Sequence, residues 1–171
     1  AELKIHPLAH PKQTLVTCEE LSVCYGEEPV FSGLSFSLNR GERIALSGRN
    51  GCGKSSVLKL LIGQNIPHTG NLSKAGGLKL SYLAQDTSSL KGNLKEYALS
   101  RGIDESLFKA ILRKLDFSRA QFEKDISSFS EGQKKKVLIA GSLSEEAHLY
   151  VWDEPLNYVD IPVSYTHLTL P

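Results

Sequence analysis

The sequence contains no methionine among its 171 residues, and position 1 is an alanine. We therefore expect the chain to be an internal piece of a longer protein. It also lacks any apolar run that approaches the ~20 residues needed by a membrane-spanning helix. These absences predict a domain that does not insert in a membrane and that has further sequence around it.

Neither sign of charge dominates, because 20 Lys and Arg residues are matched by 19 Asp and Glu residues, a net charge of +1. No overall field therefore directs the chain to nucleic acid or to an anionic membrane surface. The three cysteines, Cys18, Cys24 and Cys52, form no pair with metal-ligand spacing. We expect a reducing cytoplasm, because a disulfide at Cys52 would obstruct the glycine-rich stretch around it. The apolar content of 40% is sufficient for a globular core.

A glycine-rich stretch at residues 48–55 reads Gly-Arg-Asn-Gly-Cys-Gly-Lys-Ser. The apolar run 43–47 precedes it, and apolar residues at helical spacing follow it as far as Ile62. Strand, glycine loop and helix in this order are the context in which G-x-x-x-x-G-K-[ST] binds phosphate. Backbone N–H groups surround the phosphate oxygens, and the helix N-terminus adds positive potential. The alternative is a glycine-rich turn with a chance lysine, which the flanking strand and helix disfavour.

The chemistry of this loop assigns a role to each residue type. Lys54 is expected to contact the β- and γ-phosphates of ATP, and the Ser55 hydroxyl to bind Mg²⁺. The predicted nucleotide-binding residues are Gly48, Asn50, Gly51, Cys52, Gly53, Lys54, Ser55 and Ser56.

A second motif is the apolar strand 149–152, which is followed by Asp153 and Glu154. At the carboxyl edge of a parallel sheet, these acids would lie beside the phosphate loop. Asp153 is then expected to hold Mg²⁺, directly or through water, and Glu154 to orient and polarise the attacking water. The alternative is a strand that ends in an exposed acidic turn.

A third motif, residues 129–140, reads Phe-Ser-Glu-Gly-Gln-Lys-Lys-Lys-Val-Leu-Ile-Ala. Ser130 is a good N-cap, so a helix should begin there, and a capped helix start is a further anion site. Taken alone, this would be an ordinary helix with a solvated row of lysines. Between the two motifs, the pattern predicts strands near 71–73 and 78–83 and helices over about 93–122, with Asp104 as a cap.

The order of these motifs over about residues 14–160 resembles an ATP-binding cassette (ABC) domain. The resemblance implies an α/β P-loop NTPase cassette with a parallel core sheet, an antiparallel β subdomain and a small helical subdomain at about 86–128. It implies that Tyr25 stacks on adenine, and that Gln85 contacts Mg²⁺ and the attacking water. Alone, these two would be a packed strand tyrosine and a surface glutamine.

The same resemblance implies a composite site. Ser130, Gly132 and Gln133 match the signature that closes over the γ-phosphate of a partner cassette, and Asp160 matches the acid of the D-loop. A second cassette, in the same chain or in a dimer, is therefore the expected partner. The resemblance makes Glu154 and Gln85 the catalytic residues, and its expected metal-binding residues are Ser55, Gln85 and Asp153.

Within this superfamily, the chain is similar to the ABC-F branch, because Glu131 stands where transporters usually have glycine and the segment between Gln85 and Ser130 is short. ABC-F proteins have two cassettes in one chain and act on the ribosome. The amino-acid sequence of the motifs resembles that of members that protect ribosomes from antibiotics. In such a protein, residues 1–13 would be the end of the linker that precedes the second cassette. The alternatives are the nucleotide-binding subunit of a membrane transporter, and a nucleotide-binding module without turnover, against which Glu154 argues.

The last segment, 161–171, departs from the pattern, because it has two prolines, no charge and no helical period. His167 follows Glu154 by only 13 residues. That spacing leaves no room for a helix and a return strand, so we do not assign His167 as the switch histidine of the family. We expect a cassette truncated after the D-loop, with 161–171 as a non-native tail. Such a fragment should bind ATP but hydrolyse little of it alone.

Overall fold

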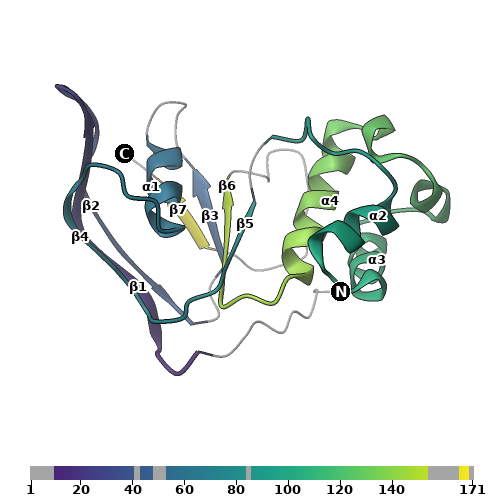
Figure 1. The fold of residues 1–171 in the computed structure, drawn as a ribbon, viewed down its shortest axis with the longest axis horizontal. Helices are drawn as coiled ribbons and strands as arrows, with labels where there is room; N and C mark the ends of the chain where they lie inside the picture. The colour runs from purple at the N-terminus through teal and green to yellow at the C-terminus, as the bar shows by residue number, and fades with distance from the viewer. Residues whose placement is uncertain (1–9, 41–42, 48–52, 84–85, 154–165, 170–171) are drawn as a thin grey trace.

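The computed structural model describes residues 10–40, 43–47, 53–83, 86–153 and 166–169. Two sheets and a group of helices form its layers (Figure 1). One sheet is antiparallel with the strand order β2-β1-β4, and the other is parallel with the order β5-β6-β3-β7. The predicted combination of an antiparallel β layer and a parallel core sheet is therefore confirmed.

The antiparallel sheet consists of β1 (Thr14–Tyr25), β2 (Glu28–Asn39) and β4 (Thr69–Lys74). The β-type runs 15–18 and 21–25 in the sequence predict two short strands here, but the structure joins them into the single strand β1. The register shifts between Cys18 and Leu21, and Glu20 has a φ of 49°. A bulge of this kind absorbs the interruption in the apolar alternation, so that the strand continues beyond it.

The parallel sheet contains β5 (Leu80–Leu83), β6 (Leu149–Asp153) and β3 (Arg43–Ser47), with β6 in the middle of these three. Alternate residues of β6 enter two different cores. Leu149 and Val151 pack with the antiparallel layer, whereas Tyr150 and Trp152 pack with the helices. Burial of both faces explains why β6 reads as a continuous apolar run.

The tail requires one correction. We expected no return strand after Glu154, yet Thr166–Thr169 forms β7, which pairs in parallel with β3. β7 lies at the edge of the sheet and covers the side of β3 that β6 does not. Threonine is a β-branched residue that favours strands. An edge strand can pair through its backbone without an alternation of apolar and polar residues, so the sequence pattern did not indicate this strand. The non-native origin of 161–171 stays a prediction.

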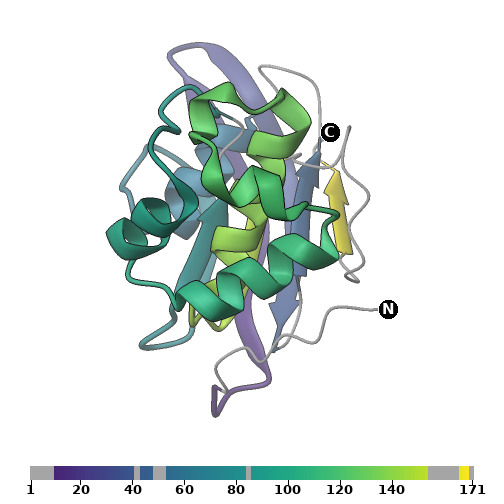
Figure 2. The ribbon, with the colours of Figure 1, turned by 90° about the vertical axis from the view of Figure 1, so that its right-hand side faces the viewer.

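Helices cover both faces of the parallel sheet. α1 (Lys54–Leu61) lies on one face, and α2 (Leu94–Arg101), α3 (Glu105–Lys114) and α4 (Glu131–Ser144) lie on the other (Figures 1 and 2). Two short 3₁₀ helices, Arg119–Glu123 and Ile126–Ser128, connect α3 to α4.

The predicted helical stretch 93–122 is thus interrupted. Gly102 ends α2 with a φ of 64°, a left-handed conformation that closes a helix. The predicted cap at Asp104 is confirmed, because its carboxylate accepts a hydrogen bond of 2.7 Å from the Leu107 N–H.

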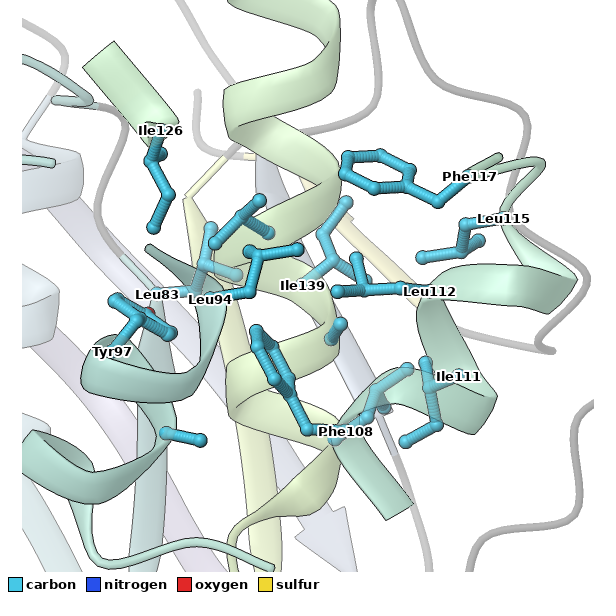
Figure 3. Packing of buried hydrophobic residues seen from close by; sticks show 14 of the residues in the cluster. Leu83, Leu94, Tyr97, Phe108, Ile111, Leu112, Leu115, Phe117, Ile126 and Ile139 are labelled. Carbon is cyan, nitrogen blue, oxygen red and sulfur yellow. The ribbon is translucent and has the colours of Figure 1, made fainter. Parts of the chain in front are cut away.

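The core beneath these helices is continuous with β5 and β6. Phe108, Leu112 and Leu94 are fully buried and face Ile139 of α4 (Figure 3). This packing holds α4 against the sheet and so sets the position of the helix that begins after Ser130. Among the described helices, none is both long and apolar enough to cross a membrane.

Candidate functional site

The site begins where β3 leads through the glycine stretch into α1. Gly53 is the N-cap of α1 and has a φ of 96°, and no side chain caps the helix start. The first turn also contains no acidic residue. Within the described part of the chain, the N–H groups of this turn and the positive end of the helix dipole therefore have no anionic side chain of the helix itself to satisfy them. Lys54 is buried, and Ser55 is exposed.

Glycine is required at position 53 for a second reason besides its φ angle. A Cβ atom there would lie 2.4 Å from Cδ1 of Phe31 and 2.7 Å from Cγ1 of Val30. Both contacts are far shorter than van der Waals distance, so β2 packs directly against the start of α1. The close approach fixes the position of the helix N-terminus relative to the antiparallel layer.

Tyr25 and Ser56 connect the two layers of the site. The Tyr25 hydroxyl lies 2.9 Å from Oγ of Ser56, which is 1% exposed. Tyr25 is the last residue of β1, and 51% of its surface is exposed. A tyrosine held by its hydroxyl while its ring stays accessible is suited to stack on a flat base next to the phosphate loop.

Asp153, the described one of the two acids predicted at the end of β6, comes to the same edge of the sheet through strand pairing. Ala45 pairs with Trp152, and Leu46 pairs with Asp153. Because β3 and β6 are parallel, their carboxyl ends meet where the glycine stretch begins. The backbone of Asp153 is thus beside the residues that lead to α1.

The third motif forms the predicted helix start. Ser130 is the N-cap of α4, and its hydroxyl accepts a hydrogen bond of 3.2 Å from the Gln133 N–H. The Gln133 side chain accepts one of 2.9 Å from the Ser130 N–H in return. This capping box orders the exposed first turn, which leaves the Ser130 hydroxyl at the surface.

Sequence reasoning missed a contact that holds this turn. The Thr87 hydroxyl donates a hydrogen bond of 2.6 Å to Oε2 of Glu131, and Thr87 is only 6% exposed. One residue earlier, hydrogen bonds from the Ser88 backbone N–H and hydroxyl lower the pKa of Asp86. Glu131, which the sequence marked only as a departure from transporters, therefore connects the start of α4 to the segment that follows β5.

The structure brings some of the predicted residues together and separates others. Gly53, Lys54, Ser55, Ser56 and Tyr25 gather at the start of α1, whereas Ser130 and Gln133 begin a helix on the opposite face of the sheet (Figure 1). The predicted site residues that lie outside the described residues are Gly48, Asn50, Gly51, Cys52, Gln85, Glu154 and Asp160.

The donor set fits a nucleotide with its metal ion. An uncapped helix start, a buried lysine and an exposed serine hydroxyl suit phosphate oxygens and a divalent cation. No cluster of three His, Cys, Asp or Glu side chains occurs in the described part of the chain. These features define a P-loop α/β domain of the nucleotide-binding class.

Comparison with known proteins makes this class more specific. Residues 31–157 match the family model described as "ABC transporter". The chain therefore belongs to the ABC transporter family, as part of its ATPase domain, which confirms the cassette fold.

Three relatives are similar over most of the chain. The probable ATP-binding protein YbiT of Escherichia coli O157:H7 is 30% identical over 84% of this chain and 28% of its own length. The probable ATP-binding protein YheS of Escherichia coli O6:H1 is 32% identical over 86% of this chain and 24% of its own length. The ribosome protection protein VmlR of Bacillus subtilis is 27% identical over 84% of this chain and 27% of its own length. The chain thus spans about a quarter of the length of these relatives.

Solved structures agree on the fold. A chain from an ABC transporter in an inward-facing conformation superposes with a TM-score of 0.66 at 27% identity, covering 86% of this chain and 63% of that one. An ATP-binding subunit of an ABC transporter gives a TM-score of 0.60 at 28% identity, covering 86% of this chain and 69% of that one.

Gly53→Ala tests the close packing at the start of α1. We expect a loss of more than about 2 kcal/mol in the free energy of unfolding, because the new Cβ adds a clash to an unfavourable φ. The matched control is Gly77→Ala, whose φ is +69° but whose Cβ would meet nothing within 4 Å. It should cost only about 1 kcal/mol, the strain of a left-handed residue alone. Urea unfolding of both variants gives the comparison, and equal losses would contradict this packing.

Tyr25 variants separate its hydroxyl from its ring. Tyr25→Phe removes the hydrogen bond to Ser56 but keeps the ring, so ATP affinity should fall by less than about tenfold, the equivalent of ~1 kcal/mol. Tyr25→Ala removes the ring as well and should weaken ATP binding further, by another ~1 kcal/mol of stacking. Equilibrium dialysis of radiolabelled ATP measures both. Equal affinity of the alanine and phenylalanine variants would show that the ring does not contact the base.

Proposed function

We propose that this chain is the ATP-binding and ATP-hydrolysing cassette of an ABC-F protein that acts on the ribosome in the cytoplasm, with antibiotic resistance by ribosomal protection as its role. The observation that carries the nucleotide part is the uncapped start of α1, with its buried lysine, beside the end of β6. The family match supports ATP as the nucleotide.

The proposed binding mode assigns roles to the described residues first and then to Glu154 and Gln85, which lie outside the described residues. Lys54 and the first N–H groups of α1 hold the β- and γ-phosphates, and the ring of Tyr25 stacks on the adenine. Ser55 and Asp153 hold Mg²⁺, which neutralises charge on the phosphate oxygens when bound. Glu154 orients and polarises the attacking water, and Gln85 holds that water from the other side.

Hydrolysis also needs a partner in this proposal. Ser130, Gly132 and Gln133 begin α4 on the face of the sheet opposite α1, so they serve the nucleotide of a second cassette rather than that of their own. Preorganised donors of this kind contribute about 3 kcal/mol each, or roughly a hundredfold in rate. A single cassette therefore keeps its phosphate-binding residues but lacks the donors that stabilise the transition state.

The ABC-F assignment depends on two further points. Glu131 occupies a position where the transporter pattern has glycine, and the structure engages it with Thr87. One of the relatives, which is similar over 84% of the chain, is named a ribosome protection protein.

The second candidate is a nucleotide-binding subunit of a membrane transporter, which the two transporter structures of similar fold favour. Co-sedimentation of the full-length protein with ribosomes distinguishes the two, because a transporter subunit would remain in the supernatant.

Lys54→Ala tests the nucleotide site. The variant loses the cation that pairs with the phosphates, so ATP affinity should fall at least tenfold, the equivalent of about 1.4 kcal/mol. Lys59→Ala is the matched control, because Lys59 lies on the same helix but is exposed near its other end. Isothermal titration with Mg-ATP measures both. Unchanged affinity in Lys54→Ala would refute the assignment.

The need for a partner has its own test. The 171-residue chain should bind Mg-ATP and release phosphate at least a hundredfold more slowly than the full-length protein with both cassettes. A steady-state phosphate-release assay on the two proteins side by side gives the ratio. Comparable turnover per site would show that the signature of a second cassette is not required.

A further inference from the structure

A chain of hydrogen bonds crosses the core between β6, α4 and β5. Nε1 of Trp152 donates to Oγ of Ser142 over 3.1 Å, and this Oγ lies 2.7 Å from Oγ of Ser81. Ser81 in turn donates to Oε2 of Glu145 over 2.9 Å. Trp152, Ser142 and Ser81 are each at most 1% exposed, so water does not supply these bonds.

The number of available protons sets the direction of the chain. A carboxylate only accepts, so Ser81 donates its single proton to Glu145 over 2.9 Å in preference to the Ser142 carbonyl oxygen, which lies 3.4 Å from the same Oγ. With this direction, Ser142 donates its own proton to Ser81, and its lone pairs accept from the indole N–H of Trp152. Every link uses one donor, and Ser142 of α4 links Trp152 of β6 to Ser81 of β5, two strands that also pair directly with each other.

A charged residue anchors the outer end of this hydrogen-bond chain, which is Glu145. Arg101 of α2 donates from Nε to Oε1 of Glu145 over 3.1 Å and from Nη1 to the Tyr97 hydroxyl over 3.2 Å. Burial alone would lower the pKa of Arg101, but its hydrogen bond to Glu145 and the neighbouring groups raise the pKa overall. A charged arginine thus anchors the Glu145 side chain at the outer end of the hydrogen-bond chain.

This hydrogen-bond chain connects the strand that ends in Asp153 to the last turn of helix α4. Trp152 directly precedes Asp153, and its strand partner Ala45 lies on β3. Ser142 lies in the last turn of α4, whose first turn follows Ser130. A phenylalanine in place of Trp152 would also fill an apolar core, and it would need no buried hydrogen-bond acceptor. The hydrogen bonds of Trp152, Ser142 and Ser81 therefore fix the alignment of α4 with β6 and β5 more closely than apolar packing alone would.

We propose that Ser142 is a positioning residue that couples the nucleotide-bound end of β6 to helix α4. The inference rests on the proposed ATP binding at the start of α1. Nucleotide that engages Asp153 pulls on the end of β6, and the bond from Trp152 to Ser142 passes this displacement to α4.

Hydrogen–deuterium exchange of the 171-residue chain, with and without Mg-ATP, tests this coupling. In the parent protein, we expect ATP to slow exchange both at the start of α1 and within α4. In Ser142→Ala, protection at α1 and ATP affinity should persist, whereas the ATP-dependent change in α4 should disappear. Ser144→Ala is the matched control, because Ser144 is a buried serine of the same helix whose hydroxyl donates within the helix, to the Ala140 carbonyl at 2.7 Å, and has no bond to β5 or β6 among the described residues.

The emission of Trp152 checks the bond itself, because Trp152 is the single tryptophan of the sequence. Loss of the acceptor in Ser142→Ala should shift the emission to shorter wavelength, and Ser144→Ala should leave it unchanged. If circular dichroism shows that Ser142→Ala does not fold, Glu145→Ala is the second variant. It removes the acceptor at the end of the hydrogen-bond chain, at a partly exposed position, and should also abolish the ATP-dependent change in the exchange of α4.

The outcomes separate this inference from the proposed function. If the parent chain binds no ATP, the proposed function fails and the coupling fails with it. If ATP binds but α4 does not respond in the parent, or still responds in Ser142→Ala, the nucleotide site stands and the role of Ser142 is refuted.

Discussion

The parallel pairing of β6 with β3 is the constraint on which the rest of this structure depends. It joins two segments that are far apart in the sequence, and it brings Asp153 opposite Leu46 at the edge where α1 begins. Under the proposed function, the helix start supplies positive groups for the phosphates and the strand end supplies Asp153 for the metal ion, so neither segment would hold Mg-ATP alone. Pairing unites both at one edge, which is where ligands bind in open α/β sheets.

This pairing is stable because β6 is buried on both faces. Leu149 and Val151 contribute to the core shared with the antiparallel layer, while Tyr150 and Trp152 contribute to the core beneath the helices. The same alternation separates two roles. α1 with its uncapped start lies over one face, and α4 with its capped first turn lies over the other (Figure 2). Under the proposed function, such a domain would offer one surface to its own nucleotide and another to a partner cassette.

The sequence predicted the parts of this arrangement that depend on local signals. Periodicity predicted the strand before Gly53, the helix after it and the apolar strand 149–152. Capping residues predicted the helix starts at Asp104 and Ser130. Glu154 and Gln85 lie outside the described residues, so their roles stay predictions.

Long-range contacts could not be predicted in this way, because neither partner shows a signal in its own neighbourhood. The bond from Tyr25 to Ser56 and that from Thr87 to Glu131 exist only once the layers pack. The serine at position 142, in the apolar second half of α4, was a local hint of a buried polar contact, but it did not identify Trp152. β7 was missed because its pairing with the edge of β3 depends on the fold already formed.

The most direct test of the account is to locate bound ATP on the chain by photolabelling with 8-azido-ATP in the presence of Mg²⁺, followed by peptide mapping. The account predicts that the labelled peptide contains Tyr25 at the end of β1, next to the start of α1, and that excess unlabelled ATP prevents the labelling. Labelling confined to peptides from α2, α3 or the second half of α4, on the opposite face of the sheet, would contradict it.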